Sequence, residues 1–399
     1  MRITVVTPLF PTSSEPYRGA PIYRTIAELA HLAEVEVICP LLRYPAWLGF
    51  RPRSFRYKDI DAQYRHSAVP AQYVEYPALP VITRPFNGLN CARTIVPYIR
   101  KTRPDVILGY WVYPEGLGAL RAARQLGVPC VLGARGSDLN GNRDMWVDGR
   151  VREILRQADY LITVSEALRQ AGLRRGARAD RTLTIANGCD VSIFHPKPRA
   201  DARAELAIRP ETELVFFNGW ISKLKGIWEL LGAVRQLAEQ RQHLQVACVG
   251  EGDLMQEWKA AIETAGLTDR FILLGRRKSA EISTWLAAAN VFCLPSHSEG
   301  CPNAVVEALA CGRAVVASSV GGIPEMVDAN SGILCPPQDA GALATALDVA
   351  LQRAWDEERI GAEHRRSWED VARETFEVCR TVLADAGRID ADTQTTAAL

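Results

Sequence analysis

Two glutamates, Glu299 and Glu307, carry the most distinctive chemistry of this sequence, within VFCLPSHSEGCPNAVVEALACGRAVVASSVGGIPEMV at residues 291–327. Glu299 falls in a polar loop, and Glu307 about five residues into a predicted helix, roughly 8 Å along its axis. Free N–H groups at the helix start, residues 301–304, would attract phosphates. The flanking carboxylates repel phosphates but accept hydrogen bonds from sugar hydroxyls. This order suits a nucleotide sugar; a capped helix with a solvated surface acid is the simpler alternative.

Secondary structure around this block must position both acids. Residues 291–294 and 314–317 are apolar runs typical of buried strands. Pro302 is expected to begin the intervening helix, since the first helical position needs no N–H donor, and Gly312 is expected to end it. The predicted order is therefore strand, loop, helix and strand.

The segment SEGCPNAVVEALACG, followed by GRAVVAS and GGIPE, resembles the E-x7-E signature of retaining GT-B glycosyltransferases of group 1 (family 4). The resemblance implies that Glu307 binds the ribose hydroxyls and that Glu299 approaches the donor sugar. It also implies a fold of class α/β, with two Rossmann-like domains, each a doubly wound parallel sheet, facing across a cleft. The residues expected around the nucleotide between the two acids are Gly300, Cys301, Pro302, Asn303 and Ala304.

The composition is compatible with such a fold. A chain of 399 residues exceeds one typical core, which favours two domains, and 48% hydrophobic with 23% charged residues is typical of a globular protein. No apolar run approaches the ~18 residues of a membrane span, and the start, MRITVVTPLFP, is predicted to be a first strand instead of a signal peptide. Ten scattered cysteines without a C-x-x-C pair predict reduced core residues of a cytoplasmic protein.

Charge is distributed unevenly along the chain. Residues 1–190 hold 26 of the 47 basic side chains but 17 of the 46 acidic ones, an excess of nine positive charges. This suggests an anionic partner, although no nucleic-acid module is present and arginine-rich codon usage is an alternative. Residues 41–58, LLRYPAWLGFRPRSFRYK, combine five aromatic with five basic residues. They predict peripheral contact with an anionic membrane at its inner face, or else a surface loop packed on the first domain.

Strand and helix patterns alternate through the first 186 residues and predict a parallel sheet whose strand ends meet ligands. The loop before Gly19 resembles the version found in enzymes of bacterial envelope polysaccharide assembly, where it lies at the donor–acceptor junction. The loop ARGSDLN (134–140) contributes Arg135 and Asp138. Related enzymes often have a histidine in place of Arg135, close to the reacting sugar. Arginine cannot act as a base, so Arg135 could clamp an anionic donor or acceptor; Asp138 is the nearest carboxylate, or a helix cap.

The segment ANGCDVSIFHP resembles the family's interdomain crossing, which predicts a first domain at 1–190 and a second at 191–362. A last helix near 363–385 is expected to cross back to the first domain, and 386–399 to form a tail.

The segment GWISKLKG follows a predicted strand of the second domain. The family has an arginine and a lysine here that grip the donor diphosphate; Lys225 matches the lysine, but Trp220 replaces the arginine. Lys223 is close enough to substitute, or the indole stacks on the sugar or base. Gly250 is expected to lie close to the donor, because the dinucleotide fingerprint fails at Met255, and Gly275 to lie where the family reads the base.

Metal binding is not expected. D-x-D triplets occur at residues 59–61 and 390–392, but neither follows a strand. Lys225, neighbouring cations and the helix N-terminus would balance the phosphate charge, without metal or other cofactor.

The resulting hypothesis is sugar transfer, with retention, from a UDP- or GDP-sugar to a glycan or lipid-diphosphate-linked acceptor. Catalysis would come from Lys225, Glu299 and Arg135, and nothing marks the nucleophile of a covalent route. The alternatives are an epimerase or other sugar-phosphate enzyme on this fold, or a non-catalytic GT-B scaffold.

Overall fold

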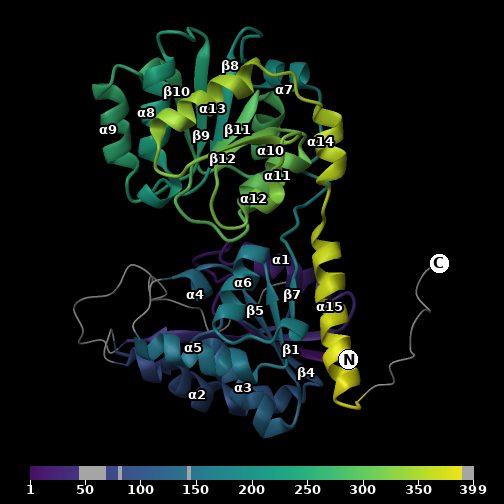
Figure 1. Ribbon diagram of the computed structural model, residues 1–399. Coiled ribbons are helices and arrows are strands. Elements are labelled where there is room, and N and C mark those ends of the chain that lie inside the picture. The colour runs from purple at the N-terminus through teal and green to yellow at the C-terminus, as the bar shows by residue number, and fades with distance from the viewer. Residues whose placement is uncertain (45–68, 80–82, 142–144, 389–399) are drawn as a thin grey trace, which may run out of the picture. The chain divides into compact units, whose positions relative to one another are not determined.

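The computed structural model describes residues 1–44, 69–79, 83–141 and 145–388. The chain forms two compact units (Figure 1): unit 1 is Met1–Ala186 with Trp368–Leu399, and unit 2 is Asn187–Ser367. The units therefore divide four residues before the expected position. From residue 45 onward the basic-aromatic stretch lies outside the described residues, as do both D-x-D triplets and the tail from residue 389.

Unit 1 is built on a seven-stranded, fully parallel sheet of order β3-β2-β1-β4-β5-β6-β7. Its strands are β1 Arg2–Val6, β2 Glu34–Arg43, β3 Ala71–Pro77, β4 Val106–Tyr110, β5 Cys130–Ala134, β6 Tyr160–Thr163 and β7 Thr182–Thr184. The order changes direction between β1 and β4, which is where open parallel sheets receive ligands.

The helices of unit 1 are α1 Ala20–Leu29, α2 Asn87–Thr102, α3 Glu115–Leu126, α4 Ser137–Asn140, α5 Met145–Gln157, α6 Glu166–Arg174 and α15 Trp368–Asp385, with 3₁₀ turns η2 Arg84–Phe86 and η3 Ala179–Arg181. Side chains alternate between the faces of a strand. Thus Ile3 and Val5 of β1 join the core beneath α1 and α15, whereas the Thr4 hydroxyl bonds that of Thr102 in α2 at 2.5 Å.

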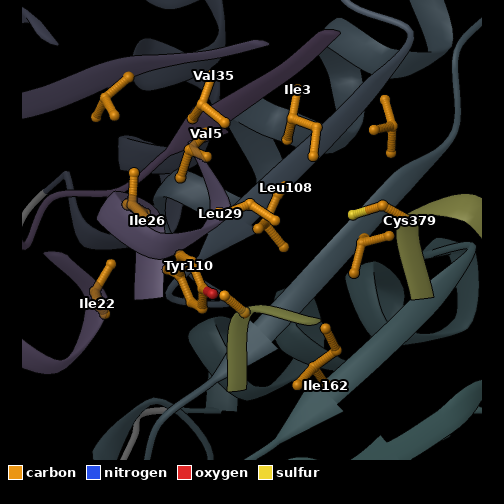
Figure 2. Close-up of a cluster of buried hydrophobic side chains, with 14 of the residues drawn as sticks. Ile3, Val5, Ile22, Ile26, Leu29, Val35, Leu108, Tyr110, Ile162 and Cys379 are labelled. Atoms are coloured by element: carbon orange, nitrogen blue, oxygen red, sulfur yellow. The ribbon is translucent and has the colours of Figure 1, made fainter. Parts of the chain in front are cut away.

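Helix α15 completes the core of unit 1. Figure 2 shows Cys379 of α15 in one cluster with Ile26 and Leu29 of α1 and Ile162 of β6. Each fully buried isoleucine or leucine of this cluster contributes roughly 1.5–3 kcal/mol. The last helix of the chain is thus a structural part of its first unit.

Unit 2 contains a six-stranded parallel sheet of order β10-β9-β8-β11-β12-β13. Its strands are β8 Glu213–Asn218, β9 Leu244–Val249, β10 Phe271–Gly275, β11 Val291–Leu294, β12 Ala314–Ser318 and β13 Gly332–Cys335. Its helices are α7 Arg199–Glu205, α8 Ile227–Leu237, α9 Met255–Thr264, α10 Ser279–Ala288, α11 Asn303–Ala310, α12 Ile323–Met326, α13 Ala340–Gln352 and α14 Glu357–Glu363, with 3₁₀ turns η4 Lys223–Lys225 and η5 Thr268–Arg270. The sheet order changes direction between β8 and β11.

The predicted α/β class with two Rossmann-like units is confirmed. All ten cysteines are buried and free, as expected. Among the described residues, no helix is long and apolar enough to cross a membrane. The basic-aromatic stretch was partly misjudged, because β2 continues through Arg43 and so includes its first three residues.

Candidate functional site

Lys225 and Glu299 meet at the change of direction in the sheet of unit 2. Lys225 ends η4, which follows β8, and Glu299 lies in the loop after β11. Lys225 Nζ is 2.5 Å from Glu299 Oε1, and the two side chains are 27% and 10% exposed. The carboxyl ends of β8 and β11 thus place a cation and an anion together where this fold class binds ligands.

The backbone around this pair is closely fitted. Gly226 has a φ of 70°, and a Cβ there would lie 1.9 Å from the carbonyl oxygen of Pro295. The His297 N–H donates to the Leu224 carbonyl at 2.9 Å. The two loops are therefore fixed to each other on both sides of Lys225.

A second pair, His297 and Glu229, was not identified from the sequence. His297 Nε2 lies 3.0 Å from Glu229 Oε1, and the side chains are 9% and 15% exposed. Glu229 belongs to the first turn of α8. Nothing in the sequence indicated the pairing, since 68 positions separate the residues.

Helix α11 begins beside this loop at Asn303, one residue after the expected start, because Pro302 is its N-cap and adopts an extended conformation. Pro302 has no N–H, which corrects the expectation of a donor at every position of 301–304. The N–H groups of Val305 and Val306 donate to the Pro302 carbonyl. Within the described part of the chain, the N–H groups of Asn303 and Ala304 have no acceptor. They are the helix-terminal donors suited to an anion.

Glu307 lies in α11, four residues after Asn303. The residue is half-buried, and loss of water around its carboxyl group raises its pKa from 4.5 to about 8. None of the hydrogen bonds among the described residues reaches this carboxyl group. It is therefore ready to accept hydrogen bonds from ligand hydroxyls.

Asn187 anchors the start of α11. Its Nδ2 donates to the Cys301 carbonyl at 2.9 Å and to Asn303 Oδ1 at 2.7 Å. The sequence indicated only a turn at Asn187 within the interdomain crossing. Its contact with the helix terminus depends on loop geometry that spacing does not reveal.

Two glycines expected near the donor have structural explanations. Gly250 has a φ of 142°, and a Cβ there would lie 1.9 Å from the Gly219 carbonyl oxygen. Its N–H donates to the carbonyl of Gly275, which ends β10 with a φ of 66°. Both glycines therefore join the loops after β8, β9 and β10. Gly300 likewise accepts a hydrogen bond from Gly322 at 2.9 Å, which fixes the Glu299 loop.

Trp220 and Lys223 differ from Lys225 in their surroundings. Trp220 is 47% exposed just after β8, and Lys223, the first residue of η4, is exposed. Lys223 forms no ion pair with the described residues, whereas Lys225 is paired with Glu299. Of the two lysines, Lys225 is thus the one held at the site.

The remaining candidates belong to unit 1. Gly19 caps α1 with a φ of 62°, and a Cβ would lie 2.2 Å from the Leu9 carbonyl oxygen, so loop closure accounts for it. The buried Asp138 carboxylate accepts hydrogen bonds from the N–H groups of Arg135 and Gly136 at 2.7–3.1 Å. The Arg135 guanidinium lies 5.9 Å from the centre of the Tyr110 ring at the end of β4. Asp138 thus shapes the turn from which Arg135 projects.

The described residues contain no group of three or more His, Cys, Asp and Glu side chains that could hold a metal ion.

Comparison with known proteins identifies the family. Residues 212–353 match the glycosyl transferases group 1 family, and residues 19–188 match the glycosyl transferase 4-like domain. TuaC of Bacillus subtilis, whose name assigns it to teichuronic acid biosynthesis as a glycosyltransferase, is 26% identical over 97% of this chain and 96% of its own. A D-inositol 3-phosphate glycosyltransferase of Frankia alni is 30% identical over 69% of this chain and 74% of its own.

The fold has solved counterparts. Anabaena HepE in complex with UDP superimposes with a TM-score of 0.75 at 21% identity, covering 96% of this chain and 100% of that one. With matches to both domains and two Rossmann-like units, this chain belongs to the group 1 glycosyltransferases of GT-B fold.

Proposed function

We propose that the protein is a retaining glycosyltransferase that moves a hexose from a UDP- or GDP-sugar to a glycan or a lipid-diphosphate-linked acceptor in cell-envelope polysaccharide biosynthesis, without a metal ion. The observation that carries the proposal is the position of Lys225 and Glu299 at the sheet's change of direction, with Glu307 farther along α11. In this arrangement Glu299 would meet the sugar of the donor, Lys225 and the helix-terminal N–H groups would meet the diphosphate, and Glu307 would meet the ribose.

In this proposal the bond between the sugar's anomeric carbon and the diphosphate breaks first, and the diphosphate keeps the electron pair. Lys225 and the N–H groups of Asn303 and Ala304 stabilise the developing charge. The acceptor hydroxyl attacks from the face the diphosphate leaves, and its proton passes to a diphosphate oxygen. Glu299 binds a hydroxyl of the transferred sugar, and Glu307 binds the ribose.

Similar proteins support the choice of substrates. TuaC, similar over nearly its whole length, carries a teichuronic acid role in its name, which favours an envelope polysaccharide. HepE has been solved with UDP, which makes UDP-sugars the first donors to test.

Membrane contact forms part of the proposal, at the cytoplasmic face where nucleotide sugars are available. Phe86, Met145 and Trp146 are large apolar side chains that are 54%, 80% and 71% exposed. They belong to one region of unit 1, because η2 packs against α5. Arg84 of η2 adds a positive charge to this region, whereas Arg150 of α5 is paired with Glu153 at 2.8 Å. Exposed apolar side chains together with a cation suit an anionic lipid surface.

A donor panel tests this function. Thermal shifts with UDP-, GDP- and ADP-sugars should select one donor, and NMR of the product should show the anomeric configuration of that donor. Inversion would exclude the retaining mechanism. Turnover should persist in EDTA, and a strict requirement for Mg²⁺ would contradict metal independence. Binding of a nucleotide sugar without any transfer would favour a non-catalytic scaffold.

A further inference from the structure

The His297–Glu229 pair has no role in the reaction outlined above, yet it lies next to the groups that do. His297 is two residues before Glu299, and Glu229 is four residues after Lys225. Both side chains are largely buried and 3.0 Å apart. This placement lets the His297–Glu229 pair hold the Lys225–Glu299 pair in position.

Four contacts join the segments 224–229 and 295–299. The Pro295 carbonyl packs on Gly226, and the His297 N–H bonds the Leu224 carbonyl. The His297 ring bonds Glu229, and Lys225 bonds Glu299. The first two contacts fix the loop backbones. The contact between the His297 imidazole and the Glu229 carboxylate adds a side-chain link between the two segments that carry Lys225 and Glu299.

Glu229 depends on this contact. Its Oε2 atom is buried and accepts no hydrogen bond from the described residues, so the bond to His297 is the one hydrogen bond of its carboxyl group within the described part of the chain. Loss of the imidazole would leave a largely buried carboxylate without a partner, which is costly. The Glu229 carboxylate would then attract Lys225, the nearest cation along the chain, and compete with Glu299 for it.

We infer that His297 is a positioning residue for glycosyl transfer, which acts by occupying Glu229 and so keeps Lys225 beside Glu299. The inference rests on the proposed function, because it concerns the groups that stabilise the leaving diphosphate. Positioning of this kind affects the transition state more than nucleotide binding, to which Glu307 and the helix terminus also contribute.

The test compares His297→Ala, His297→Gln and His364→Ala. Donor turnover is measured as release of the nucleoside diphosphate from the donor that the panel selects, and UDP or GDP affinity by calorimetry. His364 is the matched control: it is a half-buried histidine of unit 2 whose ring contacts the Ile360 backbone carbonyl instead of a carboxylate.

His297→Ala should lower kcat roughly 10- to 100-fold, since small displacements of reacting groups have effects of this size. Nucleotide affinity should change less than about 3-fold in the same variant. His297→Gln should recover most of kcat, because its amide can donate to Glu229. His364→Ala should keep wild-type kcat.

A kcat of His297→Ala within about 2-fold of wild type would overturn the inference, and so would an equal loss in His297→Ala and His297→Gln. Where His297→Ala is poorly folded, as thermal denaturation would show, the Glu229→Gln variant decides. Its amide keeps an acceptor for His297 but cannot compete for Lys225, so wild-type kcat is expected. A large loss of kcat in Glu229→Gln contradicts the inference. No turnover by the wild-type protein with any donor would overturn the proposed function itself.

Discussion

The Asn187 side chain spans from the first residue of unit 2 to the start of α11, with bonds of 2.9 Å to the Cys301 carbonyl and 2.7 Å to Asn303 Oδ1. The position of the helix N-terminus is therefore set by the segment at which the chain leaves unit 1. The N–H groups of Asn303 and Ala304 point from this terminus. Their orientation therefore depends on Asn187, a residue outside the E-x7-E segment.

The two acids should separate binding from turnover. Glu307→Ala should weaken nucleotide affinity by roughly 1.5–3 kcal/mol, the usual value of hydrogen bonds to a charged group. Glu299→Ala should leave the affinity for free UDP or GDP unchanged and depress kcat. Calorimetry that found both variants binding UDP and GDP like wild type would refute the ribose assignment of Glu307.

Phosphate stabilisation should depend on Lys225 far more than on Lys223. Lys225→Ala should reduce kcat ~10²–10³-fold, as expected for one preorganised charge-stabilising group. Lys223→Ala is the control, because Lys223 is exposed and unpaired among the described residues. Equal and mild losses in steady-state turnover would contradict this assignment.

Nucleotide binding should release a proton from the carboxyl group of Glu307. Burial raises the pKa of its carboxyl group to about 8 in the free protein, and hydrogen bonds from ribose hydroxyls favour the carboxylate, which lowers the pKa in the complex. Binding then releases a proton, so affinity should rise with pH from about 6 and level off above about 8.

Calorimetry at pH 6, 7 and 8 on the wild type and Glu307→Gln would measure this linkage. The difference between the two proteins cancels ionisation of the nucleotide itself. Parallel pH profiles would show that Glu307 keeps its proton in the complex.

Stability of unit 1 should depend on Glu115, the first residue of α3. Burial raises the pKa of its carboxyl group from 4.5 to about 7, and its partner is the Tyr76 hydroxyl, which donates to Oε1 at 3.0 Å. The folded state thus holds a proton that the unfolded state loses, so stability falls as pH rises from about 4.5 through 7.

Glu115→Gln mimics the protonated form and should remove this penalty. Above pH 7 it should raise the free energy of unfolding by up to ~3 kcal/mol, with little change at pH 4.5. Urea denaturation at both pH values provides the measurement, and Glu36→Gln, at an exposed position of β2, is the control. A gain that is the same at both pH values would point to packing instead of ionisation.

The protein should bind anionic vesicles in low salt and release them as salt increases. Replacement of Arg51, Arg53, Arg56 and Lys58 together should abolish binding, since each basic residue near the surface contributes ~1 kcal/mol. Donor binding should survive, because it belongs to unit 2. Sedimentation with anionic and neutral liposomes tests this, and equal binding to both would favour a soluble acceptor.

Much of the fold was predictable, because strand and helix patterns alternate regularly. Strand β3 was missed: it lies at the sheet edge and ends at Pro77. The extension of β2 was missed because Pro40 argues against a strand interior. Pro40 lies beyond the residues that pair with β1, so it is matched only by Val74 of β3.

The site was predictable only in part. The block around Glu299 and Glu307 stands out in sequence, but the contact of Glu299 with Lys225 joins residues 74 positions apart. That contact follows from the strand order, which brings the ends of β8 and β11 together. The support from His297 depends on the backbone fit at Gly226, and pattern alone does not reveal such a fit.

The place of α15 in the core of unit 1 sets the order in which a nascent chain can fold. Residues 1–186 leave the ribosome well before Val371, Cys379 and Leu383, whose side chains close that core. Unit 2, continuous from Asn187 to Ser367, is complete earlier. The half of the enzyme that is made first is thus the last to become stable, and until α15 has been made its apolar face is open to chaperones.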